Sequence, residues 1–163
     1  MKREYIIDGY NLMHAWADLK ARMDHHLENA RDALIMRLSG FAQRINGSVT
    51  VVFDGQEKQS RQHSGMSRIH VIYSKASEEA DHVIKRLIEK KHSHSKLTVV
   101  SSDREIRRYA GLYRSASLTS TQFIREMNSS VSRPAPAEEK YDLPMTDREV
   151  DEWMRVFQER KED

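Results

Sequence analysis

Cysteine is absent from this 163-residue sequence, which excludes disulfide bonds, thiolate zinc sites and cysteine nucleophiles. The absence is typical of proteins in the reducing cytoplasm. Long apolar runs are also missing, because none approaches the roughly 18 residues of a membrane-spanning helix. The first residues lead directly into a strand pattern instead of a signal peptide. We therefore expect a soluble, cytoplasmic protein that does not bind membranes.

The sequence also has little excess of one charge: it contains 27 Lys and Arg and 25 Asp and Glu, so the net charge is +2. The distribution of the charges is more informative than their sum. Acidic residues gather where apolar strands end, and Arg and Lys crowd the neighbouring segments. An acidic pocket in a basic frame suits a polyanion that is cut with the help of a metal. Taken singly, each basic residue could equally be an ordinary solvated charge.

Apolar residues make up 38% of the chain, which is enough for a buried sheet with covering helices. The pattern predicts the order strand, helix, strand, strand, helix, strand, helix, short strand, helix, linker, helix. Pure apolar runs such as Val49 to Phe53 indicate strands covered on both faces. Apolar residues recur every three or four positions from Leu27 to Ile45 and predict a helix that Asn46-Gly47 ends. The sequence therefore predicts an α/β fold with a mostly parallel sheet.

One domain with a terminal appendage is expected at this length. We predict the domain over residues 1–130, a linker over 131–144 and a C-terminal amphipathic helix over 145–163. A capping-box pattern, Thr146 and Glu149, begins this helix, and apolar residues follow on one face. We expect the helix to pack on the domain; docking to a partner is the alternative.

Acidic residues follow four of the predicted strands, and no other feature is as informative. They are Asp8 after Tyr5 to Ile7, Asp54 after Val51 to Phe53, Glu78 to Asp81 after Val71 to Tyr73, and Asp103 after Val99-Val100. In an open parallel sheet the carboxyl ends of the strands share one edge, where ligands bind. Carboxylates that meet there repel one another, so they must protonate, stay hydrated or hold a cation. A hard divalent metal satisfies this requirement.

Glu78 and Asp81 are three residues apart, so we expect them on one side of a helix start, where the helix dipole keeps carboxylates ionised. An ordinary helix beginning would look the same. The polar segment 56–67 reads as a loop at the rim of the pocket. The residues predicted to contact phosphates of such a polyanion are Lys58, Arg61, Arg68, Arg104 and Arg107. Tyr10 could stack on a planar group of the ligand or pack within the strand-to-helix turn.

Four segments taken together resemble the YacP-like NYN domain family, relatives of the PIN nucleases. They are Tyr5-Ile6-Ile7-Asp8-Gly9-Tyr10-Asn11-Leu12, Val51-Val52-Phe53-Asp54-Gly55, Ser77-Glu78-Glu79-Ala80-Asp81 and Val100-Ser101-Ser102-Asp103. Each segment alone is a weak signal, but four in this order are specific. The resemblance covers about residues 3–127, and the tail helix also has a counterpart in the family.

The resemblance implies a PIN-like three-layer α/β/α fold with a C-terminal helix, a Mg²⁺ or Mn²⁺ cofactor, and cleavage of single-stranded RNA by an endoribonuclease. It also implies a messenger RNA substrate and association with the ribosome. By position, it assigns metal ligation to Asp8, Glu78, Asp81 and Asp103, and a catalytic role to these four and Asn11. Asp54 and Glu79 match less well and are expected to support the site or to be incidental.

Two other classes of function compete with this interpretation. The first is a noncatalytic RNA- or ribosome-binding module on the same scaffold, although all four expected acids are present. The second is an acid-pocket phosphotransfer protein. A dehalogenase-like phosphatase needs a second Asp where this chain has Tyr10, and a receiver domain needs a late Lys that we cannot place. A flap-type nuclease would need additional helical elements for which the chain is too short.

Overall fold

Five parallel strands form one sheet in the order β3-β2-β1-β4-β5. The computed structural model describes residues 2–55, 68–75, 77–93 and 96–132. The strands are β1 Arg3–Asp8, β2 Ser48–Phe53, β3 Ile69–Tyr73, β4 Lys96–Val100 and β5 Ala116–Leu118. Every residue of β2 is buried, as a strand covered on both faces requires. The predicted parallel sheet is therefore confirmed.

In the described residues five helices lie between strands, and a sixth follows the last strand. They are α1 Gly9–Ala15, α2 Ala17–Met23, α3 Leu27–Arg44, α4 Ala80–Lys91, α5 Arg104–Leu112 and α6 Ser120–Ser132. The helix predicted from Leu27 is confirmed, and it ends where Asn46 takes the left-handed conformation with φ 51°. The connection from β1 to β2 holds three helices where the sequence predicted one, because α1 and α2 are too short to show clear periodicity.

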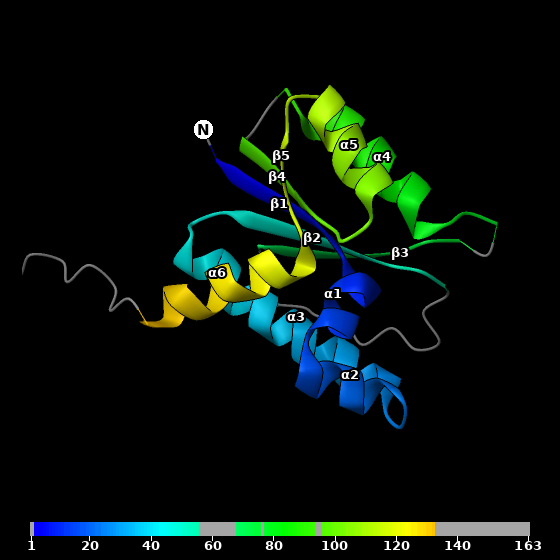
Figure 1. Cartoon of the computed structure of the whole chain (residues 1–163), viewed down its shortest axis with the longest axis vertical. Coiled ribbons are helices and arrows are strands. Elements are labelled where there is room, and N and C mark those ends of the chain that lie inside the picture. Colours follow the sequence, from blue (N-terminus) through cyan, green and yellow to red (C-terminus); the bar gives the residue numbers. More distant parts are fainter. Residues whose placement is uncertain (1, 56–67, 76, 94–95, 133–163) are drawn as a thin grey trace, which may run out of the picture. The chain divides into compact units, whose positions relative to one another are not determined.

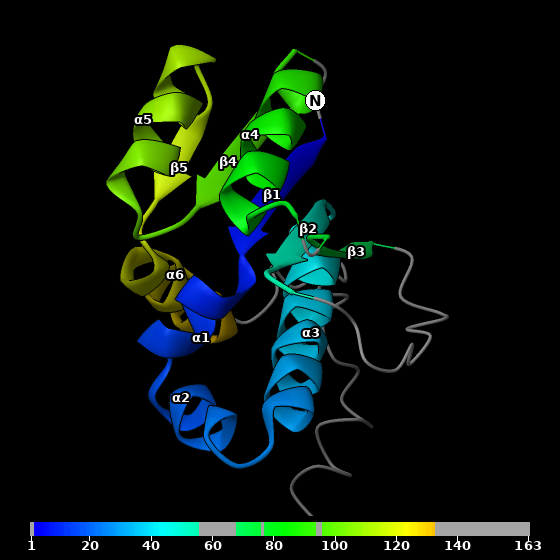
Figure 2. The same cartoon turned by 90° about the vertical axis from the view of Figure 1, so that its right-hand side faces the viewer.

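The sheet separates two apolar cores, because neighbouring strand residues point to opposite faces. Ile7 lies in the core formed with α1, α2, α3 and α6, whereas Ile6 lies in the core formed with α4 and α5. Tyr5, Phe41 and Phe123 pack ring against ring and fix α3 and α6 on the first face. Figures 1 and 2 show these helices on the two sides of the sheet. The three-layer α/β/α prediction is confirmed.

The chain changes direction across the sheet between β1 and β4. From β1 it proceeds to β2 and β3 on one side, and it then crosses to β4 and β5 on the other. Such a switch point leaves a crevice at the carboxyl ends of the two central strands, because the loops that follow them diverge. Asp8 ends β1, and the loop with Asp103 follows β4. The topology thus positions both acids at this crevice.

Some predictions concern residues outside those that the structure describes. These are the rim loop 56–67 with Lys58 and Arg61, most of the linker and the C-terminal helix at 145–163. The residues up to Asn128 form one compact unit. In the described part of the chain, no helix has the length and apolar character needed to span a membrane.

Candidate active site at the carboxyl edge of the sheet

Asp8 lies at the centre of the crevice, half-buried between the start of α1 and the end of β4. It caps α1 by accepting a hydrogen bond of 3.5 Å from the backbone N–H of Asn11. Its other oxygen accepts a bond of 3.4 Å from the hydroxyl of Ser101. Burial, with added repulsion from Asp81 and Asp103, raises the pKa of Asp8 to about 6.

Asp81 and Asp103 bring two further carboxylates to this edge. Asp81 lies in the first turn of α4, and its pKa is raised first by burial and then by the charge of Asp103. Asp103 caps α5 by accepting a bond of 2.8 Å from the backbone N–H of Glu105. Its backbone N–H donates to the Ser101 hydroxyl at 3.1 Å. Three carboxylates from three separate segments thus lie at this edge, and the charge of Asp103 adds to the raised pKa of both Asp8 and Asp81. Asp8, Asp81 and Asp103 are called the acidic triad below.

Asn11 fixes the loop that carries Asp103. Its side-chain oxygen accepts a bond of 2.8 Å from the backbone N–H of Ser102 and one of 2.6 Å from the hydroxyl of Ser120. One amide oxygen thus ties α1 to the β4–α5 loop and to the start of α6. The family resemblance implies a catalytic role for Asn11, which stays a prediction. In the structure its side-chain oxygen holds the loop beside the first acid.

Asn11→Ala is expected to lower the free energy of unfolding by about 1–3 kcal/mol, because it leaves the partners of two hydrogen bonds unpaired. Urea unfolding followed by circular dichroism measures this change. Asn29→Ala, an exposed asparagine on α3, is the matched control and should change stability by less than about 0.5 kcal/mol. Equal stability of the Asn11 variant and the wild type would show that the bridge contributes nothing.

Glu78 does not lie where the sequence placed it. The helix α4 begins at Ala80 with Glu79 as its N-cap, so Glu78 precedes the helix and shares no helical face with Asp81. Its carboxylate instead accepts two hydrogen bonds, of 2.6 and 3.2 Å, from the guanidinium of Arg86. This ion pair lowers the pKa of Glu78. The expected placement in the first turn was wrong; metal ligation by Glu78 remains a prediction and would require it to leave Arg86.

Asp54 directly follows β2, and Glu79 is the N-cap of α4. Asp54 is exposed and accepts a bond of 2.8 Å from the hydroxyl of Ser74, which in turn accepts one from Gly55 N–H at 3.1 Å. This small network fastens the ends of β2 and β3 to each other. Glu79 is exposed, and its charge contributes to the raised pKa of Asp81.

The predicted phosphate contacts divide between the two edges of the sheet. Arg104 and Arg107 lie on α5 directly after Asp103, exposed and half-buried respectively, and thus beside the acidic triad. Arg68 immediately precedes β3 and therefore lies at the opposite, amino edge, because the strands are parallel. The structure does not bring Arg68 to the crevice.

Arg31 on α3 is a candidate that the sequence analysis missed. Its guanidinium carbon lies 5.7–6.0 Å from the ring centroids of Tyr10, Phe53 and Tyr73, at the carboxyl ends of β1, β2 and β3. Its Nε is buried without a hydrogen-bond partner in the described structure. Tyr10 packs edge-on against Phe53 at 5.3 Å, which supports its packing role. A cation held on aromatic faces, with an unused donor, is suited to binding an anion.

The acidic triad suits a divalent metal by its chemistry. Mg²⁺ and Mn²⁺ prefer oxygen ligands, and a bound cation would offset both the burial and the repulsion that raise the pKa of Asp8 and Asp81. Among the described residues, no three Asp, Glu or His side chains are yet gathered closely enough to hold a metal. The donor set therefore fits, although the side chains would have to draw together.

Comparison with known proteins gives consistent matches. The model of the family described as YacP-like NYN domain matches residues 5–158. "Uncharacterized protein YacP" of Bacillus subtilis (strain 168) is 37% identical over 87 residues, which are 50% of this chain and 49% of that protein, so the alignment spans about half of the relative. A crystal structure of a mutant of Rae1 (YacP) from Bacillus subtilis has a TM-score of 0.68 and 27% identity, covering 82% of this chain and 79% of that chain. A second structure of Rae1 (YacP) has a TM-score of 0.65 and 25% identity, covering 96% and 91%.

Proposed function

We propose, since this chain belongs to the YacP-like NYN domain family, that it is a metal-dependent endoribonuclease acting at the carboxyl edge of its sheet. One observation carries the proposal: Asp8, Asp81 and Asp103 come from three separate segments, and burial, together with the charges of neighbouring aspartates, raises the pKa of Asp8 and of Asp81. A fold gains no stability from such an arrangement. Strained electrostatics of this kind at a switch-point crevice is expected of a catalytic site.

Asp8, Asp81 and Asp103 are the residues that would hold Mg²⁺ or Mn²⁺. When bound, such an ion neutralises charge on the phosphate and lowers the pKa of water. The protein's own contribution is orientation. Ser101 donates to Asp8, and Asn11 fixes the loop of Asp103, so two of the carboxylates are held before substrate arrives. Preformed positions reduce the reorganisation needed to reach the transition state.

Phosphate recognition is assigned to the cations beside the triad. Arg104 and Arg107 follow Asp103 on α5, and Arg31 offers an unused donor at the ends of β1 to β3. Single-stranded RNA suits this edge because its backbone is bound by cations without the need for a groove of fixed width. Messenger RNA, a ribosome-associated setting and a cytoplasmic location remain predictions from the family resemblance and composition. Mapping cleavage of one transcript, free and under translation, tests the first two.

A noncatalytic RNA-binding module is the competing function. The two are distinguished by incubating the protein with labelled single-stranded RNA and Mn²⁺, with and without EDTA. The nuclease proposal predicts internal cleavage that EDTA abolishes, because chelation removes the cation. Binding without cleavage at any Mn²⁺ concentration would favour the module.

Arg31→Gln is expected to slow RNA cleavage by about 10-fold or more, because a charge-assisted hydrogen bond to phosphate is worth about 1.5–3 kcal/mol. Arg37→Gln is the matched control: Arg37 also lies on α3 over an aromatic ring, Trp16, but it is paired with Asp18. Initial rates under subsaturating RNA measure both. Loss of rate in both variants alike, or in neither, would refute a specific role for Arg31.

A further inference from the structure

Cations gather at the amino edge of the sheet, opposite to Asp8. Arg3 is the first residue of β1, Arg68 directly precedes β3, Lys96 is the first residue of β4, and Arg114 lies two residues before β5. Because all strands are parallel, these four residues share one edge. The sheet therefore carries acids at its carboxyl edge and bases at its amino edge.

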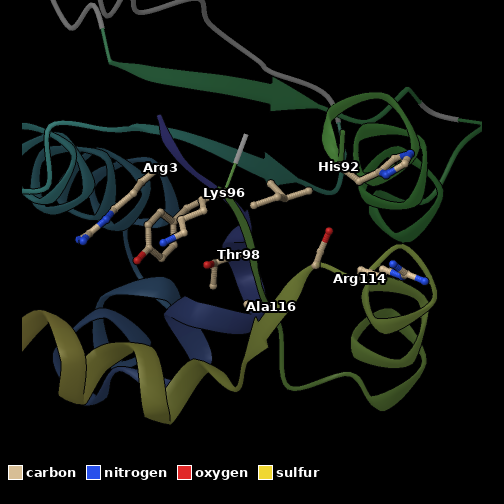
Figure 3. A pocket seen from close by; sticks show the side chains of 9 residues that line it. Arg3, His92, Lys96, Thr98, Arg114 and Ala116 are labelled. Carbon is tan, nitrogen blue, oxygen red and sulfur yellow. The ribbon is translucent and has the colours of Figure 1, made fainter. Parts of the chain in front are cut away.

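A cavity of about 410 Å³ opens at this amino edge, where β1, β4 and β5 begin. Figure 3 shows Arg3 and Lys96 on one side of it and His92 and Arg114 on the other. The volume lies within the roughly 300–1,000 Å³ of typical ligand pockets. Within the described residues, no carboxylate forms an ion pair with Arg3, Lys96 or Arg114. Positive charge therefore lies on two sides of the cavity without a direct ion pair to a described carboxylate.

Two polar groups of the cavity wall differ in how they are satisfied. The phenol of Tyr5 donates to Glu126 at 3.3 Å, which also places one acid behind this wall. The hydroxyl of Ser115 is buried and has no hydrogen-bond partner in the described structure. A buried hydroxyl without a partner is costly, so a ligand that accepts its hydrogen bond would be favoured.

Arg114 occupies a backbone position that normally requires glycine. Its backbone N–H donates to the Gly111 carbonyl at 3.0 Å, and the backbone N–H of Ser115 donates to the Ala110 carbonyl at 3.0 Å. These are the two hydrogen bonds of a Schellman motif that ends α5. Arg114 is left-handed with φ 55°. Helix α3 ends in the same motif with Asn46, the usual substitute for glycine. An arginine in this strained position suggests a binding role for its side chain.

We propose that the amino-edge cavity binds a ligand with two or more phosphate groups. Arg3 and Lys96 contact one phosphate and Arg114 and His92 another, because the two pairs flank the cavity on opposite sides. The Ser115 hydroxyl donates to a phosphate oxygen between them. An RNA backbone and a free nucleoside triphosphate both carry this chemistry. The site is separate from the carboxyl edge and does not depend on the proposed cleavage.

Binding of a labelled single-stranded RNA, in EDTA to prevent cleavage, is measured by fluorescence anisotropy, and binding of ATP by calorimetry. Lys96→Gln and Arg114→Gly are each expected to weaken binding of one or both probes by about 10-fold, and for RNA to reduce the salt slope by about 1. Ser115→Ala should weaken it by about 5-fold. Lys20→Gln is the control, since Lys20 is exposed on α2 and does not line the cavity.

Arg114→Gly also has a readout that is independent of binding. It relieves the left-handed strain, so its melting temperature should equal that of the wild type or exceed it by about 2–4 °C. If Lys96→Gln and Arg114→Gly lose affinity for RNA alone, the ligand is an RNA backbone. If they lose affinity for ATP, the ligand is a nucleotide. Unchanged affinity for both probes in Lys96→Gln and Arg114→Gly, or no binding of either probe by the wild type, would overturn the proposal. Either result is independent of whether the protein cleaves RNA.

Discussion

Asp8→Asn is expected to reduce RNA cleavage by at least about 10³-fold, because it removes a charge on which several kcal/mol of metal-assisted stabilisation depends. The same substitution is expected to raise the stability of the folded protein at neutral pH. Asparagine is nearly isosteric, and its one side-chain oxygen can still cap α1. Only the long 3.4 Å bond from the Ser101 hydroxyl loses its acceptor, because an amide NH2 takes the place of the second oxygen. A loss of activity combined with a gain in stability is unusual, and a purely structural role of Asp8 would not produce it.

The gain in stability follows from the direction of the pKa shift. The pKa of Asp8 is raised from its ordinary value of 3.8 to about 6 in the folded protein, mainly by burial. The folded state therefore binds the proton more tightly than the unfolded state, and stability falls as pH rises from about 4 to about 6. Above that window the ionised carboxylate costs up to about 3 kcal/mol, which Asp8→Asn relieves. Below pH 4 the two proteins should be equally stable.

Melting temperatures from pH 3.5 to 8 in EDTA, together with cleavage rates in Mn²⁺, measure both effects. Asp18→Asn is a control in which the change in stability is expected to have the opposite sign, because the ion pair with Arg37 lowers the pKa of Asp18. That variant should cleave RNA normally and be slightly less stable above pH 4. Cleavage at the wild-type rate by Asp8→Asn would show that Asp8 is not part of the active site. A melting temperature of Asp8→Asn below that of the wild type at pH 8 would contradict the raised pKa of Asp8.

Asp81→Asn is expected to slow cleavage by about 10²-fold or more, whereas Glu78→Gln should stay within about 3-fold of the wild type. Burial and then the charge of Asp103 raise the pKa of Asp81, whereas Glu78 is held by Arg86. The Glu78–Arg86 pair is largely exposed on the arginine side, so its loss should hardly affect stability.

Single-turnover cleavage rates at saturating Mn²⁺ compare these two variants directly, since they exclude differences in product release. Asp103→Asn belongs to the same series, because asparagine can still cap α5 and its loss of rate should match that of Asp81→Asn. If Glu78→Gln proves as damaging as Asp81→Asn, then Glu78 leaves Arg86 to join the triad, as the family resemblance implies.

The fold was predictable because its signals are local. Apolar runs identified the strands, and the repeat from Leu27 identified α3. The meeting of Asp8 and Asp103 could be predicted because parallel strands share an edge. The position of Glu78 could not be predicted. Helix α4 begins at Ala80, two residues after Glu78, and the charges of residues 78–81 fit a helix that begins at either position.

Arg31 and the amino-edge cavity were missed for a different reason. Arg31 occupies a polar position in the repeat of α3, and nothing near it in the sequence indicates that rings from α1, β2 and β3 lie beneath it. The cations of the cavity are far apart in the sequence, from Arg3 through Lys96 to Arg114. Their position at the beginnings of predicted parallel strands was the available signal, because the rule that gathered the acids applies equally to the opposite edge.

Mn²⁺ binding at pH 7.5, followed by the electron paramagnetic resonance signal of the free ion, tests the central claim most directly. The wild type is expected to bind Mn²⁺ at least about 10-fold more tightly than Asp8→Asn, Asp81→Asn or Asp103→Asn, because each variant removes one charged ligand. Glu78→Gln should bind as the wild type does. Equal affinity of the wild type and all three aspartate variants would contradict a metal site built from the acidic triad.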